Sequence, residues 1–305
     1  MTRRPRIAVV GNCQARPLAQ TVSTLFEAGA QITTVAVVHL LKDSDEPAHA
    51  DALDNADWIL AQAVADTYPC RFVQTNALRQ RHGAKVLTWP NLFFGGYNPE
   101  LMYVRDKDRR PLPGPLGDYH SATVLAAWRA GMDIDSALAL NSDDRYNRRL
   151  YEGAAERALR ELGRREALTD IRVADWIRER VWTQRLFFTF NHPAQALIAE
   201  TARQLCVRAG LAPASTQQPA SASEPLSQYR LPMNPWVRAM QGATLQDPED
   251  CAGVEVLEVA PGRVVTGARR QWPLDEAIAS FYRIYDVCGA DLPPPQKPVP
   301  PRAPA

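Results

Sequence analysis

The amino-acid sequence predicts an α/β protein with a parallel sheet covered by helices, and three observations lead to this class. Apolar runs of strand length alternate with helix-like segments through residues 6–89. The first run ends at Gly11 and is followed by a segment whose apolar residues have helical spacing. The fourth run is halted by Pro90, which cannot donate to a strand ladder. Alternating strands and helices favour parallel pairing, because a helix is the usual crossover between parallel strands.

Each element of this region follows from a local pattern. Four apolar runs are expected to be strands: Ile7–Val10, Gln31–Leu41, Asp57–Gln62 and Lys85–Trp89. Helices are expected over Ala15–Ala28, through a polar segment before the third strand, and over Phe72–His82. The last helix stops at Gly83, a residue type that readily closes a helix.

The elements beyond Pro90 are less regular. Residues 91–117 are rich in glycine, proline and aromatic residues, which predicts a loop. Three helices are expected next: Tyr119–Ala130 with Asp118 as its N-cap, Asp144–Leu162 and Thr169–Arg180. The run Leu186–Phe190 is a further predicted strand, and Pro193 is expected to open a helix that ends at Ala209. A strand at Val254–Val259 and a helix at Leu274–Tyr285 complete the expected elements.

The composition divides the chain into four consecutive parts. We expect an α/β catalytic domain over residues 1–210, and an α+β extension over residues 226–291 that packs on it. Residues 211–225 are rich in Ala, Ser, Pro and Gln, which predicts a flexible linker or loop. Residues 292–305 form a proline-rich tail that is expected to be disordered.

Charge and cysteine usage narrow the class of protein. The formal net charge of +1 argues against a nucleic-acid partner. Five scattered cysteines without metal-ligand spacing indicate reduced thiols and no metal site. No segment reaches the roughly 20 apolar residues of a transmembrane helix, and the first apolar run is too short for a signal peptide. We therefore expect a soluble, cytoplasmic protein, and the sequence leaves open whether it forms a homo-oligomer.

Cys13 is the first candidate for chemistry. It lies in the segment Gly11–Gln14, where a strand ends and a helix begins, and the N–H groups of such a turn favour a thiolate or a bound anion. His192 also follows an apolar run, so parallel strands would bring both residues to one sheet edge, where the imidazole could take the thiol proton. The alternative is that Cys13 is a buried small residue and His192 merely caps a helix.

Side-chain amides also follow several of the predicted strands. Asn12 and Gln14 flank the cysteine, and Gln62, Asn91 and Asn191 come after later strands. Such amides could position a substrate or donate hydrogen bonds to the oxyanion of a tetrahedral intermediate. Each of them could equally close a turn, which is a common role of asparagine.

A glycine-hinged aromatic loop and the segment after it are candidates for binding a cofactor. Gly96 would let the backbone approach a ligand, and Tyr97 belongs to a loop that could stack on a sugar or an adenine ring. Arg105 and Lys107 lie in a segment of alternating charge that could bind phosphates, and His120 could face the site across the loop. The alternatives are core packing for the aromatic residues and a solvated face for the charges.

Four motifs in this order give the chain a resemblance to a known family. They are Gly11–Gln14, Trp89–Asn91, Gly96–Pro99 and Phe190–Pro193. Together they resemble the WcbI family over roughly the first two thirds of the chain. The resemblance implies an SGNH-hydrolase-like three-layer α/β fold, binding of coenzyme A (CoA), and O-acetylation of a heptose-containing capsular polysaccharide. Compared with SGNH hydrolases, Cys13 stands where they carry a serine, and Thr189 stands where they usually have an aspartate.

The residues and the resemblance together predict an acetyltransferase. It would move an acetyl group from acetyl-CoA to a hydroxyl of a sugar nucleotide, a lipid-linked glycan or a polymeric glycan. In one route Cys13 takes the acetyl group after His192 removes its proton; in the other, His192 activates the sugar hydroxyl directly. Two alternatives come from different classes. A cysteine-dependent carbohydrate esterase would need no CoA, and a glycan-binding module would carry an inert thiol.

Overall fold

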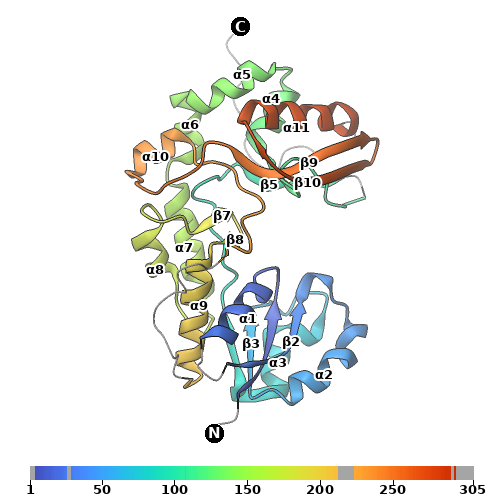
Figure 1. Ribbon diagram of the computed structural model, residues 1–305, viewed down its shortest axis with the longest axis vertical. Coiled ribbons are helices and arrows are strands. Elements are labelled where there is room, and N and C mark those ends of the chain that lie inside the picture. Colours follow the sequence, from blue (N-terminus) through green and yellow to red (C-terminus); the bar gives the residue numbers. More distant parts are fainter. Residues whose placement is uncertain (1–3, 26–28, 107, 212–222, 290–291, 293–305) are drawn as a thin grey trace. The chain divides into compact units, whose positions relative to one another are not determined.

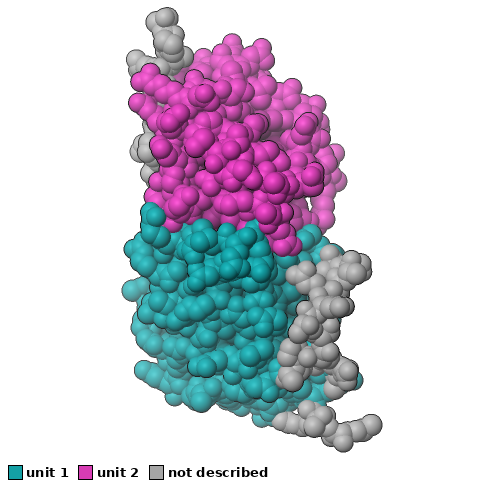
Figure 2. All heavy atoms as spheres, turned by 90° about the vertical axis from the view of Figure 1, so that its left-hand side faces the viewer, with its two compact units in different colours: residues 1–93, 159–180, 192–225 teal, residues 94–158, 181–191, 226–305 magenta. Residues whose placement is uncertain are grey.

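The computed structural model describes residues 4–25, 29–106, 108–211, 223–289 and 292. Its contacts group the chain into two compact units, which Figure 2 shows in different colours. Unit 1 comprises residues 1–93, 159–180 and 192–225, and unit 2 comprises residues 94–158, 181–191 and 226–305. The division into consecutive domains stays a prediction. Most of the expected linker and tail, namely residues 212–222 and 293–305, lies outside the described residues.

A four-stranded parallel sheet forms the centre of unit 1 (Figure 1). Its strands are β1 (Arg6–Gly11), β2 (Gln31–Val37), β3 (Trp58–Gln62) and β4 (Val86–Trp89), in the order β2-β1-β3-β4. Val10 of β1 lies opposite Ala36 of β2 and Ala61 of β3, and every pairing is parallel, as the alternation predicts. The second strand ends earlier than expected, because Val38–Leu40 form a 3-10 turn.

Helices form layers on this sheet. Helices α2 (Glu46–Asp54) and α3 (Thr75–His82) contribute Leu53 and Leu78 to one buried cluster with Ala8, Val10 and Ile59 of the strands. Helix α1 (Ala15–Thr24) has no residue in that cluster. It packs against β1, β2 and helix α9 (Gln195–Arg208), which also contacts β4. Unit 1 is therefore a mixed α/β structure in which the sheet lies between two layers of helices. Its relation to SGNH hydrolases stays a prediction.

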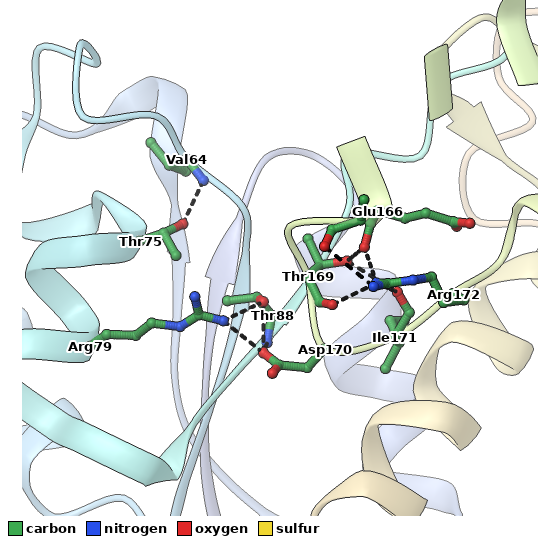
Figure 3. Close-up of polar contacts among 10 residues, drawn as sticks. Val64, Thr75, Arg79, Thr88, Glu166, Thr169, Asp170, Ile171 and Arg172 are labelled. Carbon is green, nitrogen blue, oxygen red and sulfur yellow. Dashed lines mark hydrogen bonds and ion pairs between the residues drawn. The ribbon is translucent and has the colours of Figure 1, made fainter. Parts of the chain in front are cut away.

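The edge strand β4 is held by the connection between α7 (Ala154–Glu166) and α8 (Ala174–Arg180) (Figure 3). The Asp170 carboxylate accepts hydrogen bonds from the Thr88 N–H and hydroxyl, both at 2.7 Å, and from Arg79 at 3.0 Å. Arg172 closes the same loop by donating to four of its carbonyl oxygens, those of Glu166, Ala167, Thr169 and Ile171. These bonds satisfy polar groups along the edge of the sheet, where β4 is buried, and fix the strand just before its turn.

Two predictions about the segment around His192 were wrong. The run Leu186–Phe190 contains strand β7 (Phe187–Thr189), but β7 is not one of the four strands of the parallel sheet. Pro193 does not open a helix either. His192–Pro193 is the short strand β8, and α9 begins at Gln195, with Ala194 as its N-cap. The extended backbone at His192 is the conformation that a following proline favours.

Unit 2 combines helices with short antiparallel strands. Strand β5 (Leu101–Tyr103) pairs with β6 (Tyr119–Ser121), and the hairpin of β9 (Cys251–Ala260) and β10 (Arg263–Trp272) packs against α11 (Leu274–Cys288). Its other helices include α4 (Ala122–Arg129), α5 (Ile134–Ala139), α6 (Asp144–Tyr151) and α10 (Pro235–Gln241). The strand at residues 254–259 and the helix from Leu274 were predicted, whereas β10 was not.

Three helix predictions need correction. Helix α4 follows a strand, and its N-cap is Ser121 rather than Asp118, since the Ser121 hydroxyl accepts the Val124 N–H at 3.3 Å. The predicted helix over residues 144–162 is broken at Gly153, whose φ of +67° lies outside the helical region. The predicted helix at residues 169–180 begins only at Ala174, because the preceding loop is bonded to β4.

Candidate functional site

Most of the candidate residues in unit 1 gather where the strand order reverses. Strand β1 has β2 on one side and β3 on the other, and open α/β sheets bind ligands outside the carboxyl ends of such strands. The segment from Asn12 to Gln14 follows β1, Gln62 ends β3, and Asn91 follows β4. The parallel sheet therefore brings these residues to one edge.

Four side-chain amides form one hydrogen-bonded network at this edge. Gln62 Oε1 accepts the backbone N–H of Asn12 at 3.0 Å, and Gln62 Nε2 donates to Gln14 Oε1 at 2.9 Å. Asn91 Oδ1 accepts bonds from Asn12 Nδ2 at 3.3 Å and from Gln14 Nε2 and Gln62 Nε2, both at 3.4 Å. The structure thus joins four of the five predicted amides, while their role in a reaction stays a prediction.

The network is anchored to the backbone around the cysteine. Gln14 is only 1% exposed, and it donates to the Leu92 carbonyl at 2.8 Å while accepting the Leu92 N–H at 3.2 Å. Asn12 Oδ1 accepts the Gln14 N–H at 2.9 Å, which closes the turn around Cys13. A side chain at Gly11 would lie 3.2 Å from Gln62 Cβ, so glycine allows the close approach. The conformation of this loop is therefore fixed in the free protein.

Cys13 lies half-buried in this turn, directly before α1. Burial raises the pKa of its thiol, and the N–H groups of Cys13 and Gln14 lower the pKa by less than burial raises it. This result reverses the expectation that the helix N-terminus favours a thiolate. Cys13 is therefore a thiol at neutral pH, and a base must remove its proton before it can act as a nucleophile.

His192 is a buried residue of the same unit, 6% exposed, and lies just before α9. Helices α9 and α1 pack together, with Gln195 Nε2 donating to Thr21 Oγ1 at 2.9 Å. The helix that starts beside Cys13 and the helix that follows His192 are thus packed partners. The pairing of these two side chains for proton transfer stays a prediction.

Asn191, the fifth predicted amide, belongs to unit 2. Its Oδ1 accepts the Tyr119 hydroxyl at 2.7 Å, and its Nδ2 donates to the Tyr103 hydroxyl at 3.0 Å. The rings of Tyr103 and Tyr119 lie 5.4 Å apart, and each lies 5.2 Å from Phe190. Asn191 therefore sits within an aromatic cluster of its own unit.

Tyr97 and His120, two of the residues predicted to bind the cofactor, make hydrogen bonds within the protein. The buried Tyr97 hydroxyl donates to the Val181 carbonyl at 2.6 Å, and burial raises its pKa. His120 is fully buried, with Nδ1 2.8 Å from the Tyr285 hydroxyl and Nε2 2.7 Å from the Leu112 carbonyl oxygen. Burial lowers the pKa of His120 to about 4, so this imidazole is neutral at pH 7.

The other residues of that set have different surroundings. Gly96 is buried, and a Cβ added there would lie 2.2 Å from the Phe94 ring. Arg105 is exposed and donates to the Arg109 carbonyl at 2.9 Å. Lys107 lies outside the described residues. A role of these residues in binding CoA stays a prediction.

Arg165, a residue of α7 in unit 1, is a further candidate that no sequence pattern predicted. Its guanidinium donates to the Asn91 carbonyl at 3.4 Å and lies 5.5 Å from the centroid of the Phe93 ring. Burial lowers its pKa, and Glu161 at 3.7 Å partly opposes that change. Arg165 places a half-buried positive charge beside the amide network, where it could bind an anionic group. Arg160, Arg164 and Arg165 look alike in the sequence, and only packing distinguishes them.

The part of the chain that the structure describes contains no cluster of three or more His, Cys, Asp or Glu side chains suited to a metal ion. None of its helices is both long enough and apolar enough to cross a membrane.

Comparisons with known proteins agree on one family. The family model described as "Polysaccharide biosynthesis enzyme WcbI" matches residues 6–214. A solved structure of WcbI, described as a novel polysaccharide biosynthesis enzyme, matches with a TM-score of 0.74 and 21% sequence identity, over 95% of this chain and 92% of that chain. That structure is described as the native protein without a disulfide bond between CoA and a cysteine. No curated protein matches the chain.

Proposed function

The chain belongs to the WcbI family of polysaccharide biosynthesis enzymes, and we propose that it transfers an acetyl group from acetyl-CoA to a sugar hydroxyl. The observation that carries this proposal is the position of Cys13, in a turn fixed by four amides at the reversal point of the strand order. The description of the similar structure, which mentions CoA together with a cysteine, supports CoA as the carrier. The expected acceptor is a heptose hydroxyl of a capsular polysaccharide or its precursor, in the cytoplasm.

The first half of the reaction loads the cysteine. His192 accepts the proton of the Cys13 thiol, and the resulting thiolate attacks the carbonyl carbon of acetyl-CoA. The C–S bond to CoA breaks, and CoA leaves as a thiol after taking the proton from His192. The product is an acetyl thioester on Cys13. One thioester replaces another, so this step changes the free energy little.

The second half transfers the acetyl group to the sugar. His192 removes the proton of the sugar hydroxyl, whose oxygen attacks the acetyl carbon on Cys13. The C–S bond breaks, an oxygen ester forms, and the cysteine recovers its proton from His192. Asn12, Gln14, Gln62 and Asn91 are the proposed groups that position the substrate and donate to the oxyanion. Arg165 is the residue proposed to hold a phosphate of CoA. The roles expected of Asn191, Arg105 and Lys107 stay predictions.

The test combines binding with single-turnover chemistry. Calorimetry of the purified protein with CoA and acetyl-CoA should show saturable binding in the micromolar range. Incubation with acetyl-CoA and no acceptor should release CoA and leave one acetyl group on the peptide that contains Cys13. The variant C13A should lose turnover and keep CoA binding, whereas C70A, a buried cysteine of the same unit, should remain active.

The outcomes distinguish acetyl transfer through Cys13 from direct activation of the sugar and from an esterase. Turnover near the wild-type rate in C13A would overturn the acyl-enzyme route and favour direct activation of the sugar by His192. Absence of CoA binding at millimolar concentrations would overturn acetyl-CoA as the donor. Release of acetate from an acetylated glycan without CoA would then identify an esterase.

A further inference from the structure

The backbone fixes the orientation of three of the four amides in the network. Gln62 Oε1 accepts the Asn12 N–H at 3.0 Å, and Asn12 Oδ1 accepts the Gln14 N–H at 2.9 Å. Gln14 bonds twice to Leu92, donating to its carbonyl at 2.8 Å and accepting its N–H at 3.2 Å. A backbone N–H only donates and a carbonyl only accepts, so the oxygen and the nitrogen of each of these amides cannot be exchanged.

These three amides fix the orientation of the fourth, Asn91. Their NH2 groups all face Asn91 Oδ1. Asn12 Nδ2 lies 3.3 Å from this oxygen, and Gln14 Nε2 and Gln62 Nε2 each lie 3.4 Å from it. The reverse orientation would place the Asn91 NH2 group against three NH2 groups, none of which can accept a hydrogen bond. The oxygen of Asn91 therefore points into the network, and its NH2 group points out of it.

Few amide hydrogens of the network remain for a substrate. Both hydrogens of Gln62 Nε2 are used, by Gln14 Oε1 at 2.9 Å and by Asn91 Oδ1. Both hydrogens of Gln14 Nε2 are used, by the Leu92 carbonyl and by Asn91 Oδ1. Asn12 Nδ2 gives one hydrogen to Asn91 and keeps one. Within the described part of the chain no group accepts a hydrogen bond from the Nδ2 of the half-buried Asn91, which therefore keeps both hydrogens.

The surroundings of Asn91 suit a hydrogen-bond donor. Three bonds to its oxygen polarise the amide and strengthen its N–H groups as donors. Arg165 also holds the Asn91 backbone, donating to its carbonyl at 3.4 Å. Asn91 bonds to the side chains of Asn12 and Gln14, the residues on both sides of Cys13. Its NH2 group is thus oriented beside the cysteine turn before any substrate binds, which avoids a cost of reorganisation during the reaction.

We infer that Asn91 Nδ2 is the main side-chain donor to the oxyanion that forms when Cys13 attacks acetyl-CoA, and that Gln14 and Gln62 fix its orientation. As the bond between sulfur and carbon forms, an electron pair of the carbonyl double bond moves onto the oxygen. Asn91 donates a hydrogen bond to that oxygen and keeps its proton. The inference rests on the proposed function and narrows the oxyanion donors from four amides to one.

The variant N91D tests the inference, because it preserves the network and reverses the group that points outward. One oxygen of the new carboxylate still accepts from the three NH2 groups, and the other replaces the outward NH2 group and can only accept. The rate of CoA release from acetyl-CoA without an acceptor should fall at least about a hundredfold. The midpoint of thermal unfolding should stay within about 2 °C of the wild type.

Two further variants serve as controls. In Q62E the second carboxylate oxygen faces Gln14 Oε1 and Asn91 Oδ1, which both accept, so the midpoint should fall by about 4 °C or more. Q80E makes the same change of charge on the exposed Gln80 of α3, and it should alter neither the rate nor the midpoint.

The outcomes separate this inference from the proposed function. A wild type that releases no CoA would overturn acetyl transfer through Cys13, and the role of Asn91 with it. Release of CoA by N91D at the wild-type rate would overturn only the role of Asn91. An N91D protein that is destabilised as much as Q62E would overturn the orientation of the Asn91 amide.

Discussion

Gln62 is the residue on which the amide network depends most directly, because it bonds to both the backbone before Cys13 and the side chain after it. Replacement by leucine in Q62L would remove the Gln62 partner of the Asn12 N–H and of Gln14 Oε1. We expect the free energy of unfolding to fall by about 1–3 kcal/mol. Acetyl transfer should slow about a hundredfold, since the turn loses its fixed geometry. Urea unfolding and a steady-state assay measure the two effects.

The control for this variant lies on α1. Gln20 is exposed, so Q20L should change unfolding by no more than about 0.5 kcal/mol and leave the rate unaltered. A Q62L protein with wild-type stability and wild-type rate would show that the network neither stabilises the fold nor positions the cysteine.

The thiol of Cys13 should titrate above the usual range of a cysteine, because burial raises its pKa. A raised pKa means that less thiolate is present at neutral pH than in a free cysteine. Alkylation by iodoacetamide should therefore be slow at pH 7 and increase with pH until the raised pKa is passed. The other four cysteines are buried, and C13S identifies any contribution from them. A rate that already levels off near neutral pH would contradict a raised pKa.

The sequence predicted the positions of most of the amides, but it did not predict the pKa of Cys13. Gln62, Asn91 and Asn191 were expected at one sheet edge because each follows a predicted strand. Gln62 and Asn91 do meet there, beside Asn12, whereas Asn191 belongs to unit 2. The pKa of Cys13 depends on how deeply the turn is buried, which no local pattern reports. Arg165 was not predicted for a similar reason, because its contacts with Phe93 and Asn91 join residues that are distant in the sequence.

At the scale of elements, Asp170 holds the edge strand that leads to Asn91. Burial alone would raise its pKa, but hydrogen bonds from Thr88 and the charge of Arg79 outweigh burial and lower the pKa. D170A should reduce the free energy of unfolding by about 2–3 kcal/mol, because it removes charge-assisted bonds. In the wild type this contribution should be present above the ordinary aspartate pKa and lost as the pH falls through the lowered one. Urea unfolding across the acidic range measures both effects.

A matched aspartate lies a few residues away on α8. The Asp175 side chain is 89% exposed, so D175A should change unfolding by about 0.5 kcal/mol or less. Equal losses in D170A and D175A would show that the loop does not hold β4 through Asp170.

The elements that could be predicted are those with a buried face. Strands β1, β3 and β4 are apolar runs in the sequence, and all three were found. Strand β10 is mostly exposed and rich in arginine, so it has no apolar pattern to detect. The run around Phe188 was recognised as a strand, but apolarity alone did not show that it lies outside the parallel sheet. Strand pairing is a long-range property, and local composition reports it only indirectly.

At the scale of the whole molecule, the two units draw on segments that interleave along the chain. In unit 2, His120 bonds to Tyr285, a residue 165 positions later in the sequence. A composition shift marks a boundary between consecutive segments, so it cannot show that residues 94–158 group with residues beyond 226. Contacts between distant segments decide this grouping, and they become visible only in the folded chain.

The division into two units allows a test of whether CoA binds to unit 1, which contains the proposed site. CoA at a hundredfold excess over its Kd should stabilise the fold by about 2.7 kcal/mol. Hydrogen exchange should slow in residues 11–15, 62–64 and 89–93, at the carboxyl edge of the parallel sheet, because those backbone groups surround the proposed site. Exchange in residues 274–281 of α11, which belongs to unit 2, should stay as in the free protein. Protection confined to α11 would place CoA on unit 2, and it would contradict the role proposed for Cys13.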